Sequence, residues 1–260
     1  MSHYRAIPDY YDAEYAYLDI LQYDVPFFLD RIPKRRQSIL DIACGTGRAS
    51  IPLAQAGHRV VGIDYDGDIL ALAKQKRDAV GIKENDLRLV HADALNLKLD
   101  QKFDYACIFF NTFLNFTTLK QQDQLLQSIR RHLRPNGRLW IDIFNPDLHL
   151  LAERDLTGIE PTTFFVPSLN RTVSRTMDIH RDPAMQVQQI TFQYVWFDAM
   201  GQEHREENRF KLTWIFPREL QLLLERNGFK LEKLWGDYDG SDLENDSPRI
   251  IARAKVGPSA

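Results

Sequence analysis

The stretch ILDIACGTGRAS, residues 39–50, decides the fold, because two closely spaced glycines in it join an apolar run to a helical one. The run QSILDIA (37–43) predicts a short buried strand, and the residues after Gly47 predict a helix that stops at Gly57. Glycine permits a tight turn between the two and lets a ligand approach the backbone. The stretch therefore predicts a ligand site at the carboxyl end of the first strand.

The same alternation continues along the chain. Four further apolar runs predict strands at 58–64, 87–93, 103–110 and 138–144, and helical segments follow at 67–80 and at 121–133. Five strands that alternate with helices predict a parallel sheet with helices on both faces. Before the first strand, helical spacing from Asp12 to Ile32, with a break before Pro26, predicts an N-terminal helical segment.

The pattern changes near residue 160. Three runs at 171–182, 185–199 and 203–216, separated by turns, predict antiparallel strands, and a short helix and two final strands at 230–235 and 249–255 follow. Alternation places the aromatic row Ile190, Phe192, Tyr194 and Trp196 on the inner face. We therefore expect a helical cap (1–35), one α/β domain (36–159 and 217–256) and an antiparallel β insert (160–216). The insert is a substrate lid, a subunit contact or a sheet that only packs on the domain.

The composition limits the partners of this protein. The 33 basic and 36 acidic residues give a net charge of −3, which disfavours a nucleic-acid surface. Two cysteines do not make a disulfide framework, no apolar run is long enough to span a membrane, and the N-terminus has no signal-peptide core. We expect a cytoplasmic protein, a monomer or a homodimer, without a membrane or nucleic-acid partner and without a metal.

Three acids lie at the carboxyl ends of predicted strands, namely Asp41, Asp64 and Asp93. Asp41 beside the glycines would repel a pyrophosphate, and Ser50 stands where a dinucleotide fingerprint has its third glycine. Asp64 is placed to accept the hydroxyls of a ribose, and Asp93 to accept from an exocyclic amine. A ligand with a sulfonium, an amino group, a ribose and an adenine fits all three, and that ligand is S-adenosylmethionine. The simpler reading of each acid is a helix N-cap or a solvated strand end.

These motifs resemble the class I S-adenosylmethionine-dependent methyltransferases. The matching segments are LDIACGTG, VVGIDYD, VHADALNL, FDYACIFF and LRPNGRLWID, and they run from about Ser38 to Phe144. The resemblance implies a Rossmann-like sheet of seven strands in the order 3-2-1-4-5-7-6, with strand 7 antiparallel. The final pair of strands matches that closure.

The resemblance also assigns roles to the matching residues. Gly45 and Gly47 would lie against the methionine part of the cofactor, and Asp41 would hold its amino group directly or through water. Asp64 would hold the ribose hydroxyls, and Tyr65 would pack on the adenine. The remaining matches are Asp93 and Ala94 at the adenine amine, and Phe110 and Asn111 at the site of methyl transfer.

Two features narrow the acceptor of the methyl group. The sequence FFNTFLNF after the fourth strand lacks the Asn/Asp-Pro-Pro-Tyr/Phe motif of enzymes that act on adenine or glutamine amides. The segment around Tyr11-Asp12 resembles the N-terminal Tyr-Asp segment of small-molecule methyltransferases, which implies that Tyr11 closes the site; the alternative is a tyrosine that only packs a helix. We therefore predict methyl transfer from S-adenosylmethionine to a nitrogen or oxygen of a small molecule. The alternatives are an NAD-dependent oxidoreductase and a non-catalytic binding module.

Overall fold

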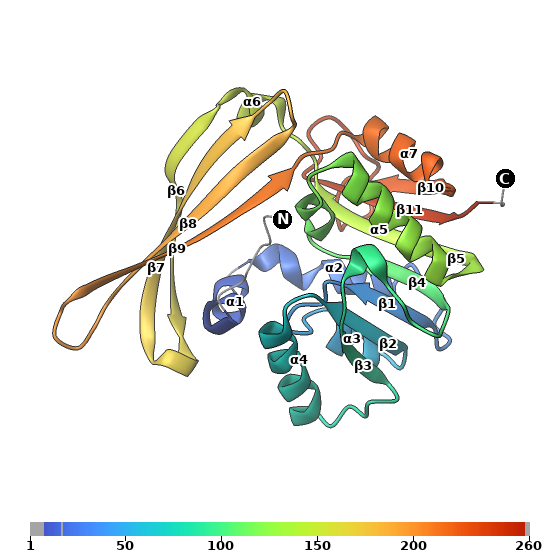
Figure 1. Ribbon diagram of the computed structural model, residues 1–260, viewed down its shortest axis with the longest axis horizontal. Helices are drawn as coiled ribbons and strands as arrows, with labels where there is room; N and C mark the ends of the chain where they lie inside the picture. Colours follow the sequence, from blue (N-terminus) through green and yellow to red (C-terminus); the bar gives the residue numbers. More distant parts are fainter. Residues whose placement is uncertain (1–7, 17, 258–260) are drawn as a thin grey trace. The chain divides into compact units, whose positions relative to one another are not determined.

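The computed structural model describes residues 8–16 and 18–257, and the chain forms two compact units. The smaller unit contains the chain up to Asp19 together with Pro146–Trp214, and the larger contains Ile20–Asn145 together with the chain from Ile215. The division between the units therefore falls inside the predicted N-terminal cap. We describe each unit by itself (Figure 1).

The larger unit is built on a seven-stranded sheet in the order β10-β11-β5-β4-β1-β2-β3. Its strands are β1 (Ser38–Ile42), β2 (Arg59–Asp64), β3 (Leu87–His91), β4 (Phe103–Ile108), β5 (Leu133–Phe144), β10 (Phe229–Trp235) and β11 (Arg249–Val256). The first five strands pair in parallel, whereas β11 is antiparallel to both β5 and β10. This confirms the predicted strand order and the antiparallel seventh strand.

Helices cover this sheet (Figure 1). They are α2 (Asp24–Leu29), α3 (Ser50–Gln55), α4 (Gly67–Ala79), α5 (Leu119–His132) and α7 (Pro217–Arg226), with short 3-10 turns η1 (Asp19–Gln22), η2 (Ala94–Asn96) and η3 (Thr112–Asn115). Local sequence sets where they begin: Thr118 and Gln121 form a capping box at the start of α5, and the Asp66 carboxylate caps α4. Pro26 lies in the first turn of α2, where its missing N–H costs no intrahelical hydrogen bond.

An aromatic cluster joins α2 to the end of the sheet that carries β5 and β10. Phe28 is fully buried, and its ring centroid lies 5.2 Å from that of Trp140 on β5. Trp140 in turn lies 5.3 Å from Trp235 on β10. Burial of side chains of this size stabilises the folded state by roughly 2–3 kcal/mol each, so α2 is a fixed part of the larger unit.

The smaller unit is a four-stranded antiparallel sheet in the order β6-β7-β8-β9. Its elements are α1 (Pro8–Tyr15), α6 (Leu148–Ala152), β6 (Asp155–Val166), η4 (Pro167–Leu169), β7 (Arg171–Asp182), β8 (Val187–Phe197) and β9 (Glu203–Thr213). Ile190, Phe192 and Tyr194 are buried on one face of β8, and Tyr10 of α1 packs against that face. The predicted inner face of this strand is therefore confirmed.

The first strand of this sheet, β6, was missed by the sequence analysis, which placed three strands after residue 170. The pairing of β6 with β7 shifts register twice, between Leu156 and Ile159 and between Ile159 and Thr162. Gly158 and Glu160 have positive φ angles there, and Pro161 follows them. These bulges destroy the apolar alternation that identifies a strand, and they are tolerated because β6 lies at the edge of the sheet.

Candidate active site

The glycine turn connects β1 to α3 through three residues in the left-handed region. Ala43, Gly45 and Gly47 have φ angles of 52°, 56° and 84°. The backbone N–H of Gly47 donates to the carbonyl of Cys44 at 2.9 Å, and the N–H of Cys44 donates to Ile63 on β2 at 2.8 Å. The turn is therefore anchored to the neighbouring strand, and its first left-handed position is occupied by a residue with a side chain.

Asp64 at the end of β2 accepts a hydrogen bond from the backbone of this turn. Its Oδ2 accepts the backbone N–H of Gly45 at 2.8 Å, and its Oδ1 accepts that of Asp66 at 2.9 Å. Burial raises the pKa of Asp64, and these two hydrogen bonds oppose that rise. The helix cap next to it is Asp66, not Asp64, so the N-cap reading of Asp64 is wrong. The structure thus brings together two residues that the sequence analysis selected for one site.

Asp41 is buried next to the glycine turn and is not exposed at the surface. Its side chain is only 2% exposed, and the hydroxyl of Ser50 donates to its Oδ2 at 2.6 Å. Burial raises the pKa of Asp41 to about 7, against the lowering effects of the Ser50 hydrogen bond and the Arg48 charge. Gly62 makes room for this pair, because a Cβ at that position would lie 2.7 Å from the Ser50 hydroxyl. The sequence analysis did not identify either Ser50 or Gly62 as site residues.

The predicted adenine residues follow β2 and β3. The Tyr65 side chain is 58% exposed, and His91 Nε2 donates to the Tyr65 carbonyl at 2.7 Å. The exposed carboxylate of Asp93 caps η2 by accepting the N–H of Leu95 at 2.9 Å, and Ala94 is the first residue of that turn. For Asp93 the simpler reading, a helix cap, is therefore confirmed. A contact with adenine stays a prediction for these residues.

The end of β4 turns through two further left-handed residues, Phe110 and Asn111, with φ angles of 43° and 64°. The N–H of Asn111 donates to the Asp142 carbonyl on β5 at 2.9 Å. The side-chain oxygen of Asn111 accepts the N–H of Phe144 at 2.7 Å. The Asn111 oxygen is therefore occupied by a structural hydrogen bond, while the catalytic role of Asn111 stays a prediction.

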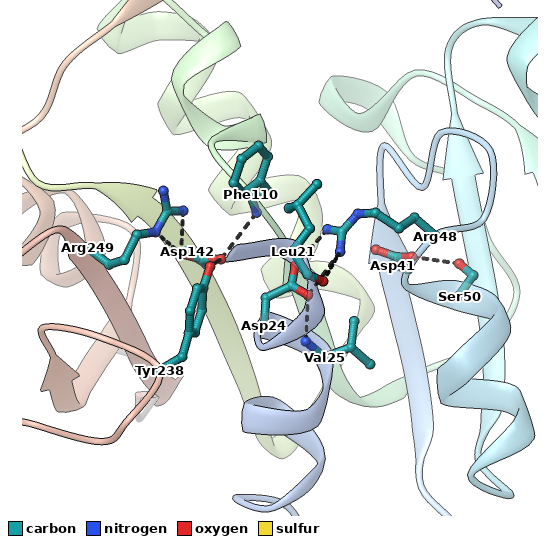
Figure 2. Close-up of polar contacts among 10 residues, drawn as sticks. All are labelled: Leu21, Asp24, Val25, Asp41, Arg48, Ser50, Phe110, Asp142, Tyr238 and Arg249. Carbon is teal, nitrogen blue, oxygen red and sulfur yellow. Dashed lines mark hydrogen bonds and ion pairs between the residues drawn. The ribbon is translucent and has the colours of Figure 1, made fainter. Parts of the chain in front are cut away.

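Two ion pairs with buried carboxylates lie in the larger unit, and the sequence analysis missed both (Figure 2). Arg48 donates from Nη1 and Nη2 to the two oxygens of Asp24 on α2, at 2.9 and 2.7 Å. Arg249 on β11 donates from Nε and Nη2 to Asp142 Oδ1, at 3.0 and 2.6 Å. The Tyr238 hydroxyl donates to Asp142 Oδ2 at 2.6 Å. Asp142 lies near the carboxyl end of an apolar strand, as the three selected acids do, so the same signal would have found it. Nothing in the sequence around Asp24 marks that residue.

Tyr11, the other predicted catalytic residue, lies on α1 in the smaller unit. Its ring is half-buried and lies 4.4 Å from the ring of Tyr15. The tyrosine that fills the core of the unit is its neighbour Tyr10, which is 2% exposed. A carboxylate holds the helix in place: Glu14 pairs with Arg175 on β7 and accepts the Tyr194 hydroxyl at 3.0 Å.

Among the residues that the structure describes, no group of three or more histidine, cysteine or acidic side chains is arranged to hold a metal ion. In the same part of the chain, no helix has both the length and the apolarity needed to cross a membrane.

Comparison with known proteins gives a family and a fold. Residues 39–137 match a family described as a methyltransferase domain. The cypemycin N-terminal methyltransferase of a Streptomyces species is 28% identical over 84% of this chain and 83% of its own. Among solved structures, an S-adenosylmethionine-dependent methyltransferase from Clostridium acetobutylicum matches with a TM-score of 0.76 at 17% identity, covering 96% of both chains. The sugar N-methyltransferase KedS8 from a Streptoalloteichus species matches with a TM-score of 0.71 at 20% identity, covering 100% of this chain and 95% of that one.

Proposed function

Because the chain is a class I S-adenosylmethionine-dependent methyltransferase, we propose that it transfers the methyl group of S-adenosylmethionine to a nitrogen or oxygen of a small-molecule acceptor. The observation that carries the cofactor site is the pair formed by Gly45 and Asp64. Both oxygens of that carboxylate accept backbone N–H groups and keep further acceptor capacity, which suits the two hydroxyls of a ribose.

The neighbouring residues fit the other parts of the cofactor. The exposed ring of Tyr65 offers a flat surface for adenine, and the exposed Asp93 carboxylate offers an acceptor for its amine. The charge of Asp41 favours the amino group and the sulfonium. Since this side chain is 2% exposed, we propose that it acts on the amino group through water.

The chemistry requires alignment more than acid–base catalysis. When bound, S-adenosylmethionine supplies a methyl group activated by a positively charged sulfur. The protein then has to hold the acceptor in line with that methyl group and exclude water. We assign this alignment to the turn at Phe110 and Asn111, which the hydrogen bonds to Asp142 and Phe144 hold in one conformation. Tyr11 stays a proposed catalytic residue, because the segment around Tyr11-Asp12 resembles that of small-molecule methyltransferases.

An amine is the first acceptor class to test. The cypemycin enzyme is named for an N-terminal methylation and KedS8 for a sugar nitrogen. The net charge of −3 offers no general attraction to nucleic acid. We propose a cytoplasmic enzyme that is active as a monomer or a homodimer. Its two buried free cysteines, Cys44 and Cys107, suit a reducing compartment.

The experiment compares cofactors and then acceptors. S-adenosylhomocysteine at about 100 times its dissociation constant should add roughly 2.7 kcal/mol to the free energy of unfolding, whereas NAD should add nothing. Formation of S-adenosylhomocysteine is then measured with amino sugars, with peptides that have a free N-terminus and with matched hydroxyl analogues. Stabilisation by NAD alone would point to an oxidoreductase. Binding of S-adenosylhomocysteine without methyl transfer to any acceptor would point to a binding module.

A further inference from the structure

The turn that follows β4 is conformationally unfavourable by itself. Phe110 and Asn111 both have positive φ angles, although neither is a glycine. Asparagine tolerates the left-handed region better than most residues, but phenylalanine does not. Two adjacent residues in this conformation persist only where surrounding contacts hold them, and such places concentrate at functional sites.

Asp142 on the adjacent strand β5 supplies contacts to both residues. Its backbone carbonyl accepts the N–H of Asn111 at 2.9 Å, and its carboxylate Oδ2 lies 3.4 Å from the N–H of Phe110. Two residues further along the same strand, the N–H of Phe144 donates to the Asn111 side chain. One short segment of β5 thus fixes the backbone and the side chain of the turn.

The Asp142 carboxylate is itself fixed and fully buried. Arg249 donates two hydrogen bonds to Oδ1, and the Tyr238 hydroxyl donates to Oδ2, the oxygen nearest Phe110 (Figure 2). The guanidinium of Arg249 also lies 5.3 Å from the centre of the Phe110 ring. The ion pair therefore contacts the turn at the backbone of Phe110 through Asp142 and at its ring through Arg249.

We infer that Asp142, oriented by Arg249 and Tyr238, is a positioning residue for methyl transfer, which holds the Phe110–Asn111 turn in its reactive geometry. The inference rests on the proposed function, because that function gives the turn its part in aligning the acceptor. Asp142 touches neither the acceptor nor the cofactor in this scheme. Its effect is on the rate of transfer at saturating substrates rather than on the binding of the cofactor.

The decisive variant is Asp142→Asn, which keeps the shape of the side chain. The new amide oxygen still accepts from Arg249, and the new amide N–H groups can donate to the Tyr238 oxygen. The same N–H groups then face the N–H of Phe110, so the side-chain contact to Phe110 is lost, while the backbone carbonyl still accepts the N–H of Asn111. Tyr238→Phe is a second variant with a smaller expected effect. It removes the hydrogen bond from the Tyr238 hydroxyl to Asp142 Oδ2 but leaves both carboxylate oxygens able to accept.

The matched control is Glu232→Gln. Glu232 on β10 pairs with Arg138 on β5 at 2.8 Å and with Arg253 on β11 at 3.1 Å. It therefore forms carboxylate–arginine ion pairs with the same two strands, β5 and β11, in a less buried place. Arg138 pairs with Tyr105 of β4, near the start of that strand, so the control lies away from the turn after β4.

The first readout needs no acceptor. In protein saturated with S-adenosylhomocysteine, Asp142→Asn should increase hydrogen exchange at the Phe110 and Asn111 amides about tenfold over Glu232→Gln, while the dissociation constant changes less than about twofold. With any acceptor that the parent methylates, Asp142→Asn should lower kcat about tenfold to a hundredfold, because displacement of a reacting group by about 1 Å costs up to that much. Tyr238→Phe should lower kcat by a smaller factor, and Glu232→Gln should leave it unchanged.

Several outcomes would overturn the inference. Equal exchange and equal kcat in Asp142→Asn and Glu232→Gln would leave Asp142 as an ordinary buried ion pair. If Asp142→Asn weakens cofactor binding as well as lowering kcat, Asp142 belongs to the cofactor site instead. If Asp142→Asn does not fold, Tyr238→Phe decides by the same two readouts. A parent that binds no S-adenosylhomocysteine would refute the proposed function, whereas hydrogen exchange compared in the ligand-free proteins would still test the control of the turn by Asp142.

Discussion

Replacement of Asp41 by asparagine should stabilise the protein at high pH and weaken its cofactor binding. Asp41 is buried beside the glycine turn, and burial raises its pKa from the ordinary value of 3.8 to about 7. The folded protein therefore prefers this carboxyl group protonated. Its contribution to stability is fully present below about pH 4 and is lost as the pH rises toward 7, where the unfolded chain has released the proton and the folded chain resists doing so.

The size of the effect follows from these two values. Each tenfold change in an ionisation equilibrium corresponds to about 1.4 kcal/mol, so a shift from 3.8 to about 7 corresponds to about 4 kcal/mol at and above pH 7. Asp41→Asn removes this penalty but leaves an amide N–H that needs a partner, which costs about 1–3 kcal/mol. We therefore expect the variant to be roughly 1–3 kcal/mol more stable than the parent at pH 8 and equally or less stable at pH 4.

The assay is denaturant unfolding of the cofactor-free protein at several pH values between 4 and 8, followed by tryptophan fluorescence. Ser50→Ala is the companion variant: it removes the hydrogen bond that lowers the pKa of Asp41, so the stability loss should extend to higher pH. Calorimetry adds a second measurement, because binding of the cationic cofactor below pH 7 should release a proton in the parent and none in Asp41→Asn. A stability difference that does not vary with pH would refute the reasoning.

Three further changes test the rest of the structure. Asp64→Ala should lower the affinity for S-adenosylhomocysteine at least about tenfold, because it removes charge-assisted hydrogen bonds worth about 1.5–3 kcal/mol each; unchanged affinity in calorimetry would contradict the ribose assignment. Glu14→Gln should leave Arg175 buried without its counter-charge and lower the free energy of unfolding by about 3–5 kcal/mol. It should also speed hydrogen exchange in α1, whereas Asp12→Asn on the same helix should not. Ala43→Gly should raise the free energy of unfolding by roughly 0.5–1 kcal/mol. A left-handed alanine costs about 1–2 kcal/mol, and the conformational entropy that glycine loses on folding offsets about half of the gain from relieving that strain. A lower melting temperature would contradict this.

The sequence determined the larger sheet and the cofactor side of the site. Apolar runs alternating with helical ones predict parallel strands, and parallel strands bring their carboxyl ends to one edge. For that reason Gly45 and Asp64, which are 19 residues apart, could be assigned to one site, and the structure joins them by a hydrogen bond of 2.8 Å. These are local signals, so they can be read without knowing how the chain packs.

Only the tertiary structure decided the features that depend on burial and on distant pairing. Asp142 and Arg249 are 107 residues apart and meet because β11 runs antiparallel beside β5. The strand β6 exists because β7 pairs with its bulged backbone, although its own pattern does not predict a strand. The state of Asp41 also belongs here: its spacing from the glycines marks it as a site residue, but its pKa of about 7 comes from the removal of water around it, which no single stretch of sequence encodes.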